Sequence, residues 1–156
     1  MKTKLLAPLA AIVAVLLFSA ASQAQSHRCH EDGVIKSVTK ATAGSFETVT
    51  FDVLIKKPGY SVKGAKPPFQ EYGSEKRLRI AGPYYKSIVF RGINWECTIG
   101  ESFTAKTTNI KAVKSVEQFE GQVEYIIGYN SRSSYVGVTT SRIPRGRRIV
   151  LKFKKN

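Results

Sequence analysis

Apolar and polar side chains alternate most clearly from Phe46 to Ile55, a stretch rich in aromatic and β-branched residues. Alternation with a period of two places one set of side chains on each face of a strand. Lys56 and Lys57 follow, and Pro58-Gly59 then introduces a turn before a second short run, Tyr60 to Val62. The pattern therefore predicts a strand, a turn and a second strand.

The same alternation, broken by turn residues, recurs along the rest of the chain. It predicts strands at residues 34–39, 60–63, 76–80, 84–90, 95–99 and 147–153. Residues 122–129 and 135–140 are interpreted as a hairpin around residues 130–133.

Residues 107–120 are ambiguous. Ile110, Val113 and Val116 have a helix-like spacing, whereas the β-branched residues favour a strand or an irregular connection. Turn signals recur roughly every 8 to 15 residues, and no long amphipathic helix is predicted. We therefore expect a single all-β domain, folded as an antiparallel β-sandwich or a partly open barrel.

Residues 1–24 have the features of a secretory signal peptide. Lys2 and Lys4 precede an apolar run from Leu5 to Phe18, and Ser22-Gln23-Ala24 places small residues where a signal peptidase cuts. A membrane anchor is the alternative, but about 14 apolar residues are short of the roughly 20 that span a bilayer. We expect export to the periplasm or the extracellular space, with no transmembrane segment after the signal is removed.

The strong positive charge of the chain indicates which classes of partner it binds. The chain has 25 basic and 11 acidic residues, a net charge of +14, and removal of Lys2 and Lys4 leaves +12. In an exported protein this charge favours anionic cell-wall glycan or envelope lipid head groups, or an acidic protein. Export disfavours nucleic acid. A charge that serves only solubility is the alternative.

Basic residues gather after the strand predicted at residues 46–55 and again near the C-terminal end. With one tyrosine they form the candidate binding residues for an anionic polymer: Lys56, Lys57, Tyr60, Lys63, Arg142, Arg145, Arg147 and Arg148. Arginine beside exposed aromatic rings suits sugar stacking and the binding of phosphate or carboxylate groups. The alternative is a solvated surface, because strand edges often carry lysine that blocks aggregation.

The two cysteines, Cys29 and Cys97, predict one disulfide bond, because an exported chain meets an oxidising environment. His27, Cys29 and His30 also form a His-x-Cys-His cluster that would bind a metal with one more ligand. That ligand would be Cys97, which is also the natural disulfide partner of Cys29. We expect the disulfide, and no metal or cofactor.

Groups for catalysis are sparse. Both histidines lie near the N-terminus, so a Ser–His or Cys–His arrangement in the body of the domain has no histidine. Glu47 and Asp52 are an odd number of positions apart on one strand, which predicts that they point to opposite faces. We therefore interpret the chain as a binding protein and not an enzyme.

Taken in order, these elements resemble the AMIN-like domain family of bacterial exported proteins. The segments that carry the resemblance are residues 46–53, the Pro-Gly-Tyr turn at 58–62, and residues 73–82, 113–116, 119–123 and 147–153. They span about residues 34–154 of an expected domain at 25–156. Two departures are Thr48, where the family usually has arginine, and residues 91–107, which include Cys97.

The resemblance implies an all-β, sandwich-like module exported to the cell envelope. The better-known AMIN relatives localise cell-wall enzymes and contact peptidoglycan. We therefore expect a non-catalytic module that contacts peptidoglycan or another anionic envelope polymer through a basic surface. A secreted effector or inhibitor that binds an acidic protein is the alternative.

Overall fold

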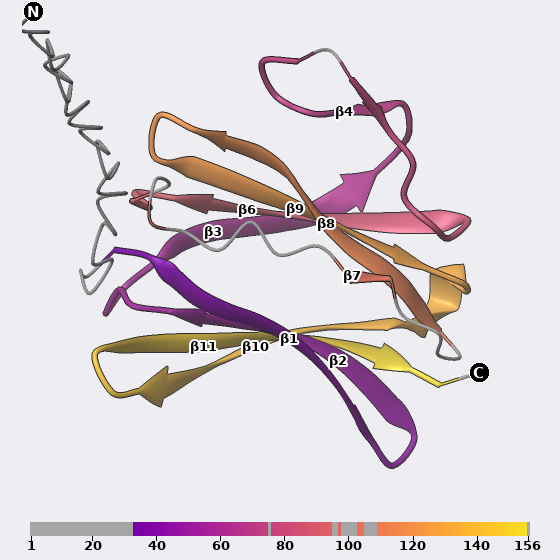
Figure 1. Ribbon diagram of the computed structural model, residues 1–156. Coiled ribbons are helices and arrows are strands. Elements are labelled where there is room, and N and C mark those ends of the chain that lie inside the picture. The colour runs from indigo at the N-terminus through magenta and orange to yellow at the C-terminus, as the bar shows by residue number, and fades with distance from the viewer. Residues whose placement is uncertain (1–32, 75, 95–96, 98–102, 105–108, 156) are drawn as a thin grey trace, which may run out of the picture.

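The computed structural model of the 156-residue chain describes residues 33–74, 76–94, 97, 103–104 and 109–155. Two antiparallel sheets lie face to face, and a small two-stranded sheet lies on the outer side of one of them (Figure 1). None of these sheets closes on itself within the described residues. The predicted all-β fold is confirmed, and of the two architectures considered it is the sandwich.

The first sheet has the spatial order β1-β2-β11-β10. Its strands are β1 (Ile35–Ala43), β2 (Phe46–Val53), β11 (Gly146–Lys154) and β10 (Tyr135–Ile143). The second sheet has the order β3-β6-β9-β8-β7. Its strands are β3 (Gly59–Ala65), β6 (Tyr84–Arg91), β9 (Gln122–Tyr129), β8 (Ile110–Phe119) and β7 (Phe103–Thr104). The small sheet pairs β4 (Phe69–Gln70) with β5 (Arg77–Leu78).

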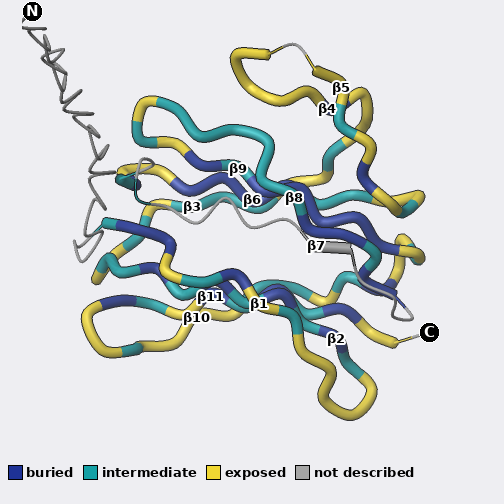
Figure 2. The backbone as a smooth tube through the Cα atoms, in the orientation of Figure 1, coloured by how far each residue is buried: buried dark blue, intermediate teal, exposed yellow. Residues whose placement is uncertain are grey.

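The main core lies between the two large sheets, where the buried sides of the strands face each other (Figure 2). β2 has the alternation that its sequence predicts, with Phe51 and Val53 buried and Asp52 between them facing outward. The Phe51 ring lies 5.2 Å from that of Phe90 and 5.1 Å from that of Tyr125, centroid to centroid. Tilted and edge-on aromatic contacts of this kind stabilise a core beyond the area they bury.

A second, smaller apolar cluster lies on the outer face of the second sheet. It is covered by residues 66–83, which we call the arm and which contain β4 and β5. Phe69 of the arm clusters with Ile126 of β9. Gly128 lets the arm lie directly on the sheet, because an ideal Cβ on this glycine would be 1.9 Å from the carbonyl oxygen of Ala81.

The hairpin predicted from residues 122–129 and 135–140 is wrong. β9 pairs with β6 and β8, whereas β10 pairs with β11 in the opposite sheet. The 3-10 turn Arg132–Ser134 carries the chain from one layer to the other. The hairpin partner of β9 is β8, joined through Glu120 and Gly121, whose φ angles of 46° and 76° suit a two-residue type I′ turn.

Other predicted elements differ in extent. The ambiguous segment 107–120 contains β8, so the strand interpretation is the correct one. Only Arg77–Leu78 of the strand predicted at 76–80 is a strand. The strand predicted at 95–99 lies outside the described residues except for Cys97, and the signal peptide lies wholly outside them. No helix in the described ranges is both long and apolar enough to cross a bilayer.

Candidate functional site

Two segments that are distant in sequence meet at one end of the sandwich: the β2–β3 connection and the β10–β11 hairpin (Figure 1). β11 begins beside the end of β2, with Arg147 opposite Val53. Gly146 permits this approach, because an ideal Cβ at this position would lie 2.0 Å from the carbonyl oxygen of Val53. The Nε of Arg147 donates a hydrogen bond to the carbonyl oxygen of Lys56 at 3.0 Å. Backbone packing and a side-chain hydrogen bond therefore join the two segments.

A groove of about 390 Å³ lies between these segments, and we call it the basic groove. Its lining residues are Lys56, Lys57, Arg142, Ile143, Arg145, Gly146 and Arg147. Five of these seven are cationic, and none of the seven carries a carboxylate. A second hollow of about 490 Å³ adjoins the groove and shares Lys56 and Arg145 with it. The structure thus brings Lys56 and Lys57 together with Arg142, Arg145 and Arg147, which are distant in the sequence.

Arg145 has an unusual backbone conformation. It is the second residue of the two-residue turn between Ile143 and Gly146, and its φ is 65°. This left-handed conformation is uncommon outside glycine because the Cβ crowds the backbone. Arg145 has this conformation directly before Gly146, whose backbone lies tightly against the end of β2. Glu120 in the β8–β9 turn has the same left-handed conformation, so at Arg145 it reflects the geometry of a two-residue hairpin turn.

Arg148, another predicted site residue, does not line the groove. Its Nε and Nη2 donate hydrogen bonds to Oδ1 and Oδ2 of Asp52 at 2.7 and 2.8 Å. The hydrogen bonds from Arg148 hold the pKa of Asp52 below its ordinary value, against the opposing effect of partial burial. This bidentate pair links β11 to β2 on the outer face of the sheet.

Tyr60 and Lys63 also lie outside the groove, on β3. The hydroxyl of Tyr60 shares a hydrogen bond of 2.9 Å with Oγ1 of Thr140, which joins the edge strand of one sheet to the edge strand of the other. The Tyr60 ring lies 6.3 Å from the Phe90 ring. Lys63 is exposed further along β3, opposite Ser87. Of the eight predicted residues, five line the groove and three have other environments.

Glu47 points into the core, opposite to Asp52, as the spacing predicts. It is fully buried, and its carboxylate accepts hydrogen bonds from the backbone N–H groups of Asn109 and Ile110, the latter at 2.7 Å. A buried carboxylate satisfied by backbone donors holds β2 to the start of β8. These contacts give Glu47 a structural role.

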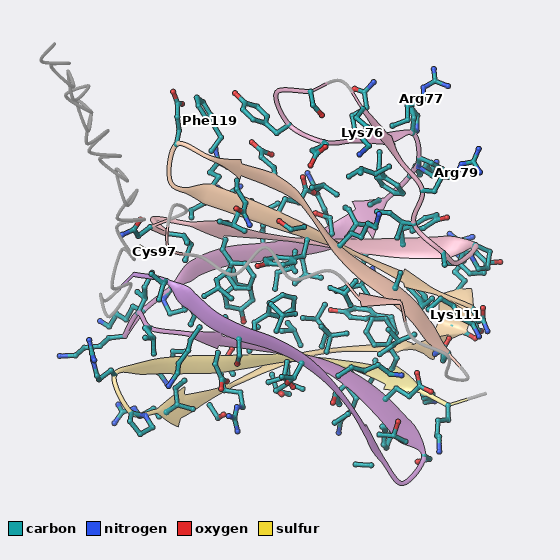
Figure 3. The ribbon with its side chains drawn as sticks, viewed as in Figure 1. Lys76, Arg77, Arg79, Cys97, Lys111 and Phe119 are labelled. Atoms are coloured by element: carbon teal, nitrogen blue, oxygen red, sulfur yellow. The ribbon has the colours of Figure 1, made fainter. Side chains whose placement is uncertain are left out.

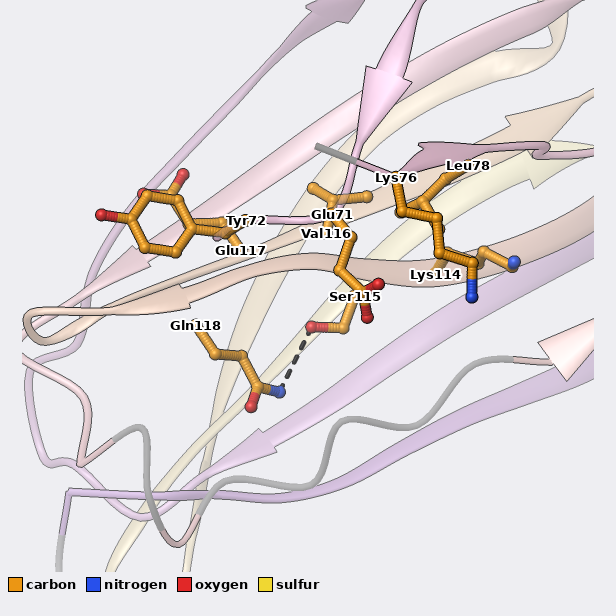
Figure 4. Close-up of a pocket in the computed structure, with 9 residues that line it drawn as sticks. All are labelled: Glu71, Tyr72, Lys76, Leu78, Lys114, Ser115, Val116, Glu117 and Gln118. Carbon is orange, nitrogen blue, oxygen red and sulfur yellow. Dashed lines mark hydrogen bonds between the residues drawn. The ribbon is translucent and has the colours of Figure 1, made fainter. Parts of the chain in front are cut away.

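A third set of basic residues, Lys76, Arg77 and Arg79, lies on the arm, remote from the β10–β11 hairpin (Figure 3). Beneath the arm is a pocket of about 430 Å³ that also contacts β8 (Figure 4). In it, the Nε2 of Gln118 donates a hydrogen bond to Oγ of Ser115 at 3.2 Å. The charged residues of this pocket carry both signs: Glu71, Glu117, Lys76 and Lys114. This balance makes the pocket a poorer site for a polyanion than the basic groove.

A metal site is not found in the described part of the chain, where no three His, Cys, Asp or Glu side chains lie close enough to hold an ion. The His-x-Cys-His cluster at residues 27–30 falls outside that part. Cys97 is disulfide-bonded. Its pairing with Cys29 stays a prediction, since Cys29 is not among the described residues.

Comparison with known proteins identifies the family. The AMIN-like domain family matches residues 33–155, which include every described strand. No curated protein matches the chain significantly. AMIN-like domains are associated with the bacterial cell envelope and are generally non-catalytic binding modules. The resemblance drawn from the strand order is confirmed: the chain belongs to the AMIN-like domain family.

Proposed function

We propose that this protein is an exported, non-catalytic binding module of the cell envelope and that its basic groove contacts peptidoglycan or another anionic envelope polymer. The observation that carries the proposal is the groove itself. Five cationic residues from two distant segments surround one hollow, and none of the described residues that line it is acidic. Concave surfaces lined by charges of one sign concentrate the field and attract counter-charged ligands.

The energetics favour a polymer over a single small anion. One exposed ion pair contributes only about 0–1 kcal/mol, because water and salt screen it. Several such contacts made at once by a repeating polyanion add up, since each later contact is intramolecular. Arginine supports this mode because its planar guanidinium binds carboxylate and phosphate groups with two hydrogen bonds.

Sedimentation with purified cell walls tests the proposal. Walls that retain their anionic polymers are compared with peptidoglycan stripped of them, so the two ligand sources are distinguished. The test variant is Arg142→Glu with Arg145→Glu, since both residues line the groove and Arg147 already anchors Lys56. The matched control is Arg77→Glu with Arg79→Glu, which changes the net charge equally on the exposed arm.

We expect the groove variant to bind at least about tenfold more weakly than the wild type, a change of about 1.4 kcal/mol, and the arm variant to change much less. Binding should also weaken as salt rises, because screening shortens the range of each contact. Equal losses in the two variants, or binding that ignores salt, would refute the groove as the site. A salt-sensitive one-to-one complex with an acidic protein, without wall binding, would support the effector alternative instead.

A further inference from the structure

Another cavity lies at the end of the sandwich opposite to the basic groove. It is lined by the end of β3, the start of β6, the end of β9 and the start of β10, and its volume is about 670 Å³. Since β10 runs from Tyr135 to Ile143, the strand separates the cavity from the groove by roughly 26 Å at 3.3 Å per residue. The two hollows are therefore distinct sites on one molecule.

Aromatic rings dominate this cavity, and we call it the tyrosine cavity. Tyr84, Tyr129 and Tyr135 line it from three different strands. Tyr129 is buried, and its ring packs against the core with its centroid 5.1 Å from that of Phe153. Tyr84 is 40% exposed, with its ring 6.1 Å from that of Tyr129. The cavity thus offers an accessible aromatic ring beside anchored ones.

Positive charge is the second feature of the tyrosine cavity. Lys66, Lys86 and Arg132 line it, and the described lining residues include no carboxylate. The Nζ of Lys86 lies 4.4 Å from the centre of the Tyr135 ring, within the range of a cation–π contact. The Tyr129 and Tyr135 phenols can donate hydrogen bonds at physiological pH, because a tyrosine is neutral there even at its ordinary pKa and burial raises the pKa of both further.

Together these features specify a ligand with a ring and a negative charge. An aromatic face stacks well on the C–H face of a sugar ring, which is apolar, while the sugar hydroxyls reach neighbouring polar groups. A neutral sugar would leave the three cations unused, and a bare phosphate would leave the exposed tyrosine ring unused. The volume is within the usual range of roughly 300–1,000 Å³ for small-molecule sites.

We propose that the tyrosine cavity binds an acidic saccharide, with a sugar ring stacked on Tyr84 and its acid group near Lys86 and Arg132. This site does not depend on the basic groove. The tyrosine cavity would recognise one charged sugar unit, whereas the basic groove would attract a polyanion less selectively.

Calorimetric titration of the whole exported protein tests the site with four probes. The probes are a glucuronate-containing oligosaccharide, its neutral glucose counterpart, glucose 6-phosphate and inorganic phosphate. We expect the glucuronate oligosaccharide to bind at least tenfold more tightly than its neutral counterpart and than inorganic phosphate. Glucose 6-phosphate distinguishes a carboxylate site from one that accepts any acid group on a sugar. Equal binding of the neutral probe, or of inorganic phosphate, would overturn the proposal.

Variants connect this binding to the cavity. Tyr84→Ala and Lys86→Met should each weaken the glucuronate oligosaccharide about tenfold, whereas Tyr84→Phe should retain most of the affinity because the ring remains. Tyr72→Ala is the matched control, since Tyr72 is 51% exposed on the arm, outside the cavity. Loss of binding in the Tyr72 variant, or unchanged binding in both cavity variants, would refute the site. The groove variant should bind this probe normally, so this proposal and the proposed wall binding can fail separately.

Discussion

Gly146 touches the backbone of Val53 so closely that an ideal Cβ on the glycine would lie 2.0 Å from the Val53 carbonyl oxygen. The contact places the β10–β11 hairpin against the end of β2, where the basic groove forms. Contacts this short have no room for a methyl group, since the opposing atom belongs to the backbone and cannot rotate away.

Gly146→Ala is therefore expected to destabilise the protein by about 1–3 kcal/mol and to weaken polymer binding, because the hairpin must move away from β2. Urea unfolding and wall sedimentation measure the two effects. Gly64→Ala, at a lining residue of the tyrosine cavity, is the control for the unfolding measurement: no atom lies within 4 Å of its ideal Cβ and its φ is not positive, so a change within about 0.5 kcal/mol is expected. Equal effects of the two substitutions would contradict this role of Gly146.

The sequence predicts the strands better than their arrangement. Alternation in β2 and β11 identifies the buried faces because that signal is local, and Phe51 and Ile149 lie on those faces. The sheet to which β9 or β10 belongs depends on pairing between distant residues, and the prediction of a hairpin around residues 130–133 is wrong for that reason. The Glu120-Gly121 turn was the local signal that could have corrected it.

The candidate site shows the same division. Charge identified five of the groove residues, because surface lysine and arginine at turns are visible in the sequence. The shape of the groove could not be predicted from the sequence, because Gly146 and Val53 meet only when β11 pairs with β2. Likewise, Tyr84, Tyr129 and Tyr135 belong to three different strands, and only the folded sandwich brings them into one cavity.

Glu47 provides a second test of the fold. Its carboxylate accepts from the backbone N–H of Ile110 at 2.7 Å and from that of Asn109 at 3.2 Å, in the buried core. Glu47→Ala would leave both donors buried without these bonds, at about 1–3 kcal/mol for each unsatisfied group. We expect a loss of about 3 kcal/mol or more in urea unfolding.

Glu47→Gln should lose less than Glu47→Ala, because the amide oxygen can still accept a hydrogen bond while the charge is removed. Glu71→Ala is the surface control, since Glu71 is exposed on the arm, and it should change the unfolding free energy by less than about 0.5 kcal/mol. A small effect of Glu47→Ala, similar to this control, would show that the carboxylate does not hold β8 in place.

The disulfide prediction can be tested by chemistry. The N–H of Asn94 donates to the carbonyl oxygen of Gly33 at 2.6 Å, so the chain shortly before Cys97 lies beside the chain shortly after Cys29. Cys97 is disulfide-bonded, and the chain has two cysteines. Peptide mapping without reductant should find the two cysteine peptides joined within one monomer. A loop of this length implies that reduction lowers stability by about 4 kcal/mol in the chain-entropy model. A covalent dimer on a non-reducing gel would contradict the intramolecular pairing.

The Asp52–Arg148 pair predicts how stability depends on pH. Two hydrogen bonds from Arg148 keep the pKa of Asp52 below its ordinary value of 3.8. The unfolded chain therefore binds a proton more readily than the native protein. The stabilisation is complete above the ordinary pKa and is lost as the pH falls through the lowered native pKa.

Urea unfolding of the wild type and of Asp52→Asn at about pH 7 and about pH 2 measures this contribution. We expect the wild type to be more stable than the variant at neutral pH, with the difference shrinking in acid as Asp52 takes up a proton. Glu71→Gln, which removes an exposed carboxylate on the arm, is the control and should show a much smaller pH-dependent difference. A difference between wild type and Asp52→Asn that is the same at both pH values would mean that the ion pair contributes nothing.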